Sequence, residues 1–177
     1  MSDLLTRDEY QAIAESLDFP RTAFIDGEFR QQLEETGMGV YKEVETVALA
    51  RKMDIFSIVY VASPEEAKAM AEAGADVIIA HVGCTVGGSI GVTDAAMSLD
   101  DAAVATQAII DAGASVRDDL IFLSHGGPIA TPSDAAFINE KTDAVGFVGA
   151  SSLERMAVEE SLTELTREFK SIPVKRA

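Results

Sequence analysis

The chain has two histidines, and each stands at the end of an apolar run that has the composition of a buried strand. His81 ends the run 76–81 and His125 ends the run 119–125, with a glycine within two residues of each ring. An imidazole can act as a general base, a general acid or a hydrogen-bond donor to a carboxylate or phosphate. The alternative is a neutral ring that bonds a backbone carbonyl and has a structural role. No acidic residue stands beside either histidine to complete a metal site, so no metal ligand is predicted.

Glycine-rich segments beside both histidines predict a site for an anion. Residues 83–91 contain four glycines and two hydroxyl side chains, and a Gly-Gly-Pro turn follows the second histidine. Glycines allow backbone N–H groups to approach a ligand closely and to bind an anion. A flexible loop without a function would have the same composition. The predicted substrate- or anion-binding residues here are Gly87, Gly88, Ser89, Gly126 and Gly127.

A third candidate segment follows the last apolar run of the chain, residues 144–148. Ser151 and Ser152 stand at a predicted helix start, where free N–H groups and the helix dipole favour a phosphate. Arg155 would add positive charge to that site. The alternatives are that Ser152 only caps the helix and that Arg155 lies in solvent.

Two further residues could carry reactions. Glu35 precedes the glycine-rich segment 36–39, where its carboxylate could reach a substrate as general acid or base. The alternative is a solvated acidic pair with Glu34. Cys84 would act as a nucleophile only if a nearby base lowered its pKa, and the alternative is a lone polar residue in a loop.

The elements that must position these residues alternate between strand and helix. Strands are predicted at residues 55–61, 77–80, 120–123 and 145–148, with a fifth near 17–25. Caps predict the start of the intervening helices, and Thr6 is predicted to cap a helix at the amino end. This order indicates an α/β protein with a parallel sheet, in which strand ends converge on one face. We expect one domain, 1–177, that forms a partial (β/α) barrel of about five βα units.

Composition limits the classes of function. Apolar residues make up 47% of the 177 residues, and 30 acidic against 14 basic residues give a net charge of −16. This charge disfavours nucleic acid and anionic membranes as direct partners. The acidic surplus is typical of proteins from a high-salt host, and the alternative is an ordinary acidic cytosolic protein. No apolar run approaches the ~20 residues that span a bilayer. A single cysteine is typical of a reducing cytoplasm, so we expect a cytoplasmic protein.

The chain from Phe19 to Phe169 resembles the phosphoenolpyruvate hydrolase-like TIM-barrel family, whose domain also forms the carboxyl half of a plant tobamovirus-resistance protein. The resemblance implies a TIM barrel that hydrolyses or lyses a small phosphorylated or carboxylated acid, with Glu35, His81 and His125 as catalytic candidates. Residues 82–86 depart from the family pattern. The matching segments are 24–30, 33–39, 65–81, 87–91, 125–129 and 149–155.

The resemblance also implies that this chain starts at about the fourth strand of the barrel, without the first three βα units. In related mutases the metal-binding acids lie largely in those units. The resemblance therefore leaves open whether a divalent cation is required, and no residue of this chain supports one. We therefore expect a homo-oligomer, or a partner chain that supplies the missing units. The alternatives to an enzyme are a non-catalytic binding module and one half of a split barrel.

Overall fold

The structure is a computed structural model that describes residues 32–88, 91–93 and 97–173. The helix predicted after Thr6 and the strand predicted near residues 17–25 lie outside these ranges. The elements, in chain order, are α3 (Val40–Lys52), β1 (Ile58–Val61), α4 (Pro64–Ala73), β2 (Val77–His81), α5 (Leu99–Ala114), β3 (Ile121–His125), α6 (Pro132–Lys141), the π-helix η1 (Ser151–Met156) and α7 (Ala157–Lys170).

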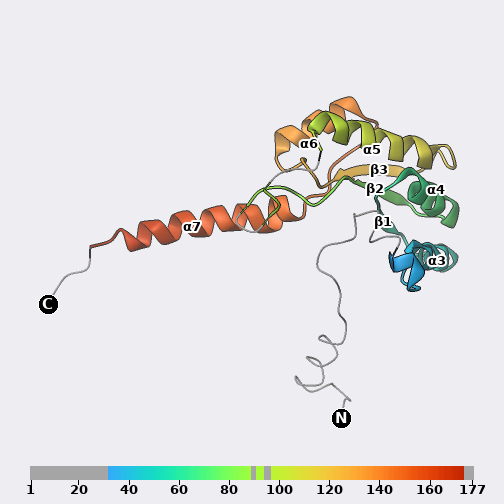
Figure 1. Ribbon diagram of the computed structural model, residues 1–177, viewed down its shortest axis with the longest axis horizontal. Coiled ribbons are helices and arrows are strands. Elements are labelled where there is room, and N and C mark those ends of the chain that lie inside the picture. The colour runs from blue at the N-terminus through green and yellow to red at the C-terminus, as the bar shows by residue number, and fades with distance from the viewer. Residues whose placement is uncertain (1–31, 89–90, 94–96, 174–177) are drawn as a thin grey trace, which may run out of the picture.

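Strands β1, β2 and β3 form a parallel sheet in that order, and a helix connects each strand to the next (Figure 1). The predicted α/β class with a parallel sheet is confirmed. Residues 145–148 run beside β3 as predicted, but they form only a parallel bridge, Ser124 to Phe147. The Val148 N–H donates to the Ser124 carbonyl at 2.9 Å. A partial barrel of five units stays a prediction.

Capping residues start and end the helices where the sequence indicates. The Ser63 hydroxyl accepts from the Glu66 N–H at 3.2 Å, and Gly74 ends α4 with a φ of 98°. Ser98 and Thr131 both form capping boxes. These local signals hold because each cap satisfies a backbone N–H that has no partner inside the helix.

The first strand is shorter than the sequence predicts, because it begins at Ile58 and not at residue 55. The Ile55 N–H donates back to the Ala50 carbonyl at 3.0 Å, and Asp54 has a left-handed φ of 57°. The apolar residues between α3 and β1 therefore belong to the turn that closes the helix.

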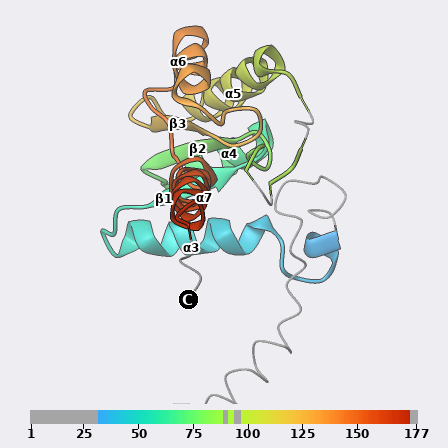
Figure 2. The ribbon, with the colours of Figure 1, turned by 90° about the vertical axis from the view of Figure 1, so that its left-hand side faces the viewer.

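The two faces of the sheet have different surroundings. Val61, Ile78 and Phe122 share a buried core with Met70 of α4 and Ile110 of α5. Figure 2 shows these helices packed along the strands. Since successive side chains of a strand point to opposite faces, Tyr60, His81 and His125 lie on the other face of the sheet.

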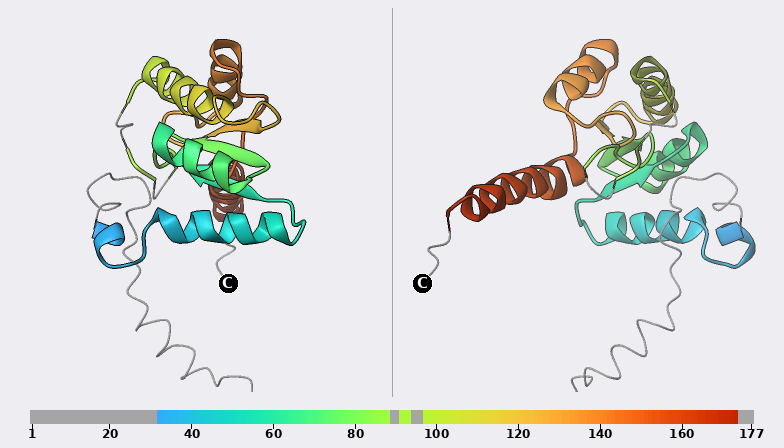
Figure 3. Two further views of the ribbon diagram at one scale, coloured as in Figure 1. Left: turned by 90° about the vertical axis from the view of Figure 1, so that its right-hand side faces the viewer. Right: turned by 60° about the vertical axis from the view of Figure 1, so that its left-hand side comes forward.

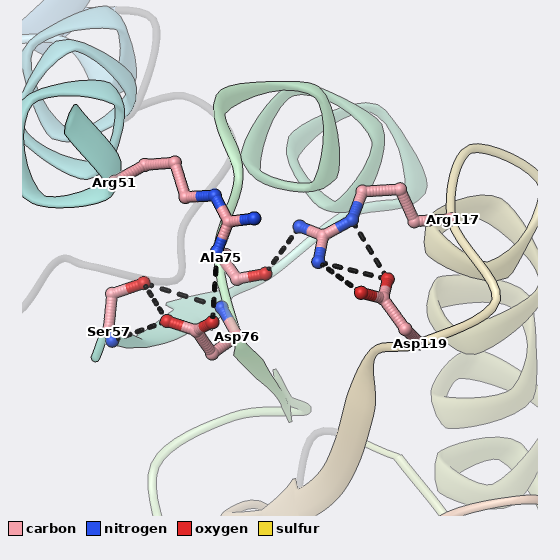
Figure 4. A network of polar contacts seen from close by, with 6 residues as sticks. All are labelled: Arg51, Ser57, Ala75, Asp76, Arg117 and Asp119. Atoms are coloured by element: carbon pink, nitrogen blue, oxygen red, sulfur yellow. Dashed lines mark hydrogen bonds and ion pairs between the residues drawn. The ribbon is translucent and has the colours of Figure 1, made fainter. Parts of the chain in front are cut away.

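Polar contacts join the amino ends of the strands (Figure 4). The Asp76 carboxylate accepts from the Ser57 N–H at 2.8 Å, and Arg51 lies 3.9 Å from it. Arg117 pairs with Asp119 at 2.9 Å and donates to the carbonyl of residue 75 at 2.8 Å. This end of the sheet is held by structural contacts, and the histidines occupy the other end.

The ion pair at this end predicts a loss of stability in acid. The Arg117 hydrogen bonds lower the pKa of Asp119 from its ordinary value of 3.8. A carboxyl whose pKa is lower in the folded chain stabilises it above the ordinary pKa, and that contribution disappears as pH falls through the lowered value. Asp119→Asn should therefore lower the urea midpoint at about pH 7, and the difference from the unaltered chain should shrink at about pH 2.5. Asp118→Asn is the control of equal charge change, and an equal loss for both variants would contradict the assignment.

Helix α7 extends away from the α/β body (Figures 1 and 3). The predicted amphipathic helix is present, and none of its residues is buried. Val158, Leu162, Leu165 and Phe169 lie at helical spacing and are at least half exposed. Among the described elements, α7 makes its main contacts with η1. Within the ranges described, the chain has no helix of the length and hydropathy needed to cross a membrane.

Candidate functional site

Three rings meet at the carboxyl ends of the strands. His81 and His125 are the last residues of β2 and β3 and are direct partners in the sheet register. Their ring centroids lie 4.8 Å apart. Tyr60, from β1, lies 5.4 Å from the His81 ring and 5.1 Å from the His125 ring. The structure therefore brings together the two predicted histidines and adds the phenol of Tyr60 from the neighbouring strand β1.

The rings line a cavity of about 600 Å³ beside β1 and α3. Among the lining residues of the described chain, Glu43 is the one carboxylate, and none is Lys or Arg. The cavity can therefore hold an apolar ligand with a few polar atoms, which is the common form of a small-molecule site. The other lining residues are Thr46, Val47, Ile58, Val59, Val61 and Ala62.

Hydrogen bonds to the backbone fix both imidazoles. The His125 Nδ1 lies 2.7 Å from the Val148 carbonyl oxygen, and the side chain is only 7% exposed. The His81 Nδ1 accepts from the Gly83 N–H at 3.3 Å. Phe147 stacks on His125 with centroids 6.3 Å apart. The main chain therefore holds each ring through its Nδ1.

Gly126 and Gly127 connect the loops that follow the two histidines. The Gly127 N–H donates to the Gly83 carbonyl at 2.6 Å, and its own carbonyl accepts from the Val86 N–H at 3.1 Å. Both glycines have positive φ angles, 84° and 55°. The structure gives this pair a role in holding the loops together, and their contact with an anion stays a prediction.

A second group of predicted residues lies around Arg155. Its guanidinium donates to the Gly87 carbonyl at 3.0 Å and pairs with Glu159 at 3.2 Å. A side chain at Gly88 would overlap the guanidinium, so this glycine permits the loop to pack on Arg155. Arg155 therefore does not lie free in solvent. Binding of an anion by these residues stays a prediction, and Ser89 lies outside the described residues.

Ser151 and Ser152 open the π-helical turn η1, which continues into α7. The helix N-cap is Ala150, so the alternative that Ser152 caps the helix is wrong. The Ser152 Oγ is buried and has no hydrogen-bond partner within the described chain. Short π-helical turns occur frequently at functional sites. Binding of an anion by Ser151 and Ser152 stays a prediction.

Glu35 and Cys84 do not line the cavity beside the histidines. The neighbouring Glu34 has a structural role, because its carboxylate accepts from the Val40 N–H at 2.6 Å and so caps α3. Cys84 is exposed. The catalytic role predicted for Glu35 remains a prediction. In the part of the chain that the structure describes, no group of three or more His, Cys, Asp or Glu side chains could hold a metal ion.

Tyr60 is the site residue that sequence reasoning missed. Burial, and after it the negative charge of Glu154, raise the pKa of the Tyr60 hydroxyl above its ordinary value of 10.0. The hydroxyl therefore stays protonated at neutral pH and can donate a hydrogen bond. A signal was available, since Tyr60 is the one residue with a polar group in the strand sequence Ile-Val-Tyr-Val, one residue from its carboxyl end.

Comparisons with known proteins match nearly the whole chain. A family model described as phosphoenolpyruvate hydrolase-like matches residues 9–172. Two tomato (Solanum lycopersicum) proteins, the ToMV resistance protein Tm-1(GCR237) and the ToMV susceptible protein tm-1(GCR26), are each 49% identical over 156 residues. The match covers 88% of this chain and 21% of each relative, so the chain spans about a fifth of their length.

One solved structure is also similar in part. A nitroalkane oxidase from Streptomyces ansochromogenes is 26% identical, with a TM-score of 0.40. The match covers 62% of this chain and 31% of the oxidase chain.

Proposed function

Because the chain belongs to the phosphoenolpyruvate hydrolase-like family, we propose that it is an enzyme-like domain that acts on a small phosphorylated or carboxylated acid. The reaction would be hydrolysis or lysis, with His81 and His125 as the acid–base groups. We also propose that the described sheet is part of a (β/α) barrel of about five βα units, with the site at the carboxyl ends of its strands.

The adjacent histidines carry this proposal. Their rings come from different strands, lie 4.8 Å apart and line one cavity. Two imidazoles within reach of one ligand can remove a proton at one point and donate one at another. The place of the cavity at the carboxyl ends of parallel strands supports a ligand site, since loops converge there.

Alanine at either histidine should weaken ligand binding at least about tenfold, a loss of about 1.4 kcal/mol. Each variant removes a hydrogen-bonding group that lines the cavity, and His125→Ala also removes the contact with the Val148 carbonyl. Calorimetry with phosphoenolpyruvate and with inorganic phosphate measures the change. Tyr41→Phe is the control, because its hydroxyl bonds the Gly37 carbonyl and the ring does not line the cavity. Equal affinities in the unaltered chain and both histidine variants would refute the site.

A non-catalytic binding module is the second candidate. It is favoured by the absence of Lys and Arg among the described residues that line the cavity, since phosphoryl transfer commonly uses such cations to stabilise charge. Phosphorus NMR of phosphoenolpyruvate with the protein separates the two candidates. Release of inorganic phosphate supports the enzyme, and binding without release supports the module.

A further inference from the structure

The cavity beside the histidines is larger than a small acid needs. Its volume is about 600 Å³, within the range of about 300–1,000 Å³ that holds drug-sized ligands. Ile58 and His81 both line it, and Ile58 lies beside Val77 in the sheet register, at the other end of β2 from His81. At about 3.3 Å per residue, these two lining residues are about 13 Å apart along the strands. A three-carbon acid bound at the rings leaves most of this length empty.

The long wall of this cavity is apolar. Residues 58–62 all line it, which includes the whole of β1, and Val47 of α3 lines it as well. Among residues 58–62, Tyr60 is the one with a polar side chain. Ile58 is 58% exposed, so a ligand that covers this side chain removes apolar surface from water. Each methylene that a ligand buries against such a wall strengthens binding by up to about fourfold.

The polar groups at the ring end of the cavity suit a carboxylate better than a phosphate. The raised pKa of Tyr60 keeps its hydroxyl a donor at neutral pH. The Val77 N–H donates to the Ser57 carbonyl at 3.1 Å, so in the alternating pattern of a strand the backbone N–H of Tyr60 points away from β2. A carboxylate can accept from such neutral donors. Phosphate is commonly bound by Lys or Arg, whereas the described lining has neither and contains the carboxylate of Glu43.

We propose that the cavity selects a carboxylic acid with an apolar alkyl chain over a phosphorylated acid. The carboxylate lies at the ring end of the cavity and accepts from the Tyr60 hydroxyl, and the alkyl chain follows β1 toward Ile58. A small phosphorylated acid fits less well, because the described lining has no Lys or Arg for its phosphate and the acid has no apolar part for the wall. This inference rests on the proposed function and narrows its class of substrate.

Calorimetry with a series of 2-oxo acids tests the proposal, because the polar part stays constant and only the alkyl chain grows. Pyruvate, 2-oxobutanoate, 2-oxopentanoate and 2-oxohexanoate add one methylene at a time. We expect 2-oxohexanoate to bind at least about tenfold more tightly than pyruvate, since three methylenes at up to about fourfold each allow about sixtyfold. It should also bind more tightly than phosphoenolpyruvate. Equal affinities along the series, or tighter binding of phosphoenolpyruvate, would overturn the proposal.

A matched pair of variants tests where the alkyl chain lies. Ile58 and Ile121 begin β1 and β3, both pair with Val77, and they are 58% and 44% exposed. Ile58 lines the cavity and Ile121 does not. Ile58→Ser should lower the ratio of the affinities for 2-oxohexanoate and pyruvate at least about threefold, and Ile121→Ser should preserve it. Both acids are measured on the same variant, so a partial loss of folding cancels from the ratio. An unchanged ratio in Ile58→Ser, or an equal fall in both variants, would overturn the place of the alkyl chain along β1.

His125→Ala separates this proposal from the function on which it rests. The variant removes a side chain from the ring end of the cavity, so it should weaken every acid of the series by a similar factor. Affinities that depend on His125 but do not change with the length of the alkyl chain would overturn the proposal and leave the proposed function standing. Absence of binding by all of the acids would refute the proposed function, and this proposal with it.

Discussion

Alanine at Gly126 should lower the free energy of unfolding by about 2–4 kcal/mol. Gly126 has a φ of 84°, in the left-handed region that costs a residue with a Cβ about 1–2 kcal/mol. The added Cβ would also overlap the Gly83 carbonyl oxygen and lie 3.2 Å from the His81 Cε1. The backbone of the Gly83 loop must move to admit it.

Gly37→Ala is the matched control for this variant. Gly37 has a similar φ of 76°, but a Cβ there would meet only the Tyr41 hydroxyl oxygen, at an ordinary 3.6 Å. Its expected loss is therefore about 1 kcal/mol, from the backbone conformation alone. Urea unfolding of both variants isolates the cost of the overlap as the difference between them. Equal losses at the two glycines would show that the loops after β2 and β3 are not in contact as described.

The same substitution should disturb the position of one histidine more than the other. A shifted Gly83 loop moves the N–H that bonds the His81 Nδ1. The His125 ring should keep its position, because the Val148 carbonyl holds that ring from another segment.

The sequence predicts the helices and the sheet well because their signals are local. Ser63, Ser98 and Thr131 begin helices because each side chain accepts a hydrogen bond from a backbone N–H three residues later. The strand boundary at Ile58 is predicted less well. A hydrophobic run shows that residues are apolar, but it does not show that the Ile55 N–H bonds the end of α3.

The sequence predicts only the part of the site that comes from residues at strand ends, because the ends of parallel strands converge. His81 and His125 come together because parallel strands place equivalent positions side by side. Tyr60 was missed because it precedes the strand end and looks like an ordinary buried aromatic residue. Arg155 shows a different limit, since its hydrogen bond to the Gly87 carbonyl joins residues 68 positions apart, and no local pattern indicates that contact.

We expect the purified chain to form an oligomer in solution, with a mass at least twice its 18.8 kDa at micromolar concentration. The apolar row of α7, namely Val158, Leu162, Leu165 and Phe169, is at least half exposed. Phe56 and Ile58, near the edge strand β1, are also exposed. Apolar surface of this extent usually marks an interface, and β1 has an unpaired edge within the described sheet. Light scattering measures the mass, and a compact monomer would refute the expectation.

A pair of neighbouring variants tests whether the apolar row of α7 carries the association. Leu162→Glu and Thr163→Glu each add one negative charge to α7, but only the first lies in the apolar row. We expect Leu162→Glu to lower the measured mass and Thr163→Glu to leave it near that of the unaltered chain. Equal effects would show that added charge, and not the loss of apolar contact, controls the association.

Salt should strengthen this association because each chain carries a net charge of −16. Repulsion between copies opposes contact at low ionic strength, and screening shortens its range to about 3 Å at 1 M salt. The apolar contact is not screened, so the mass of the unaltered chain should rise between about 0.1 M and 1 M NaCl. A fall in mass over this range would mean that ion pairs hold the copies together.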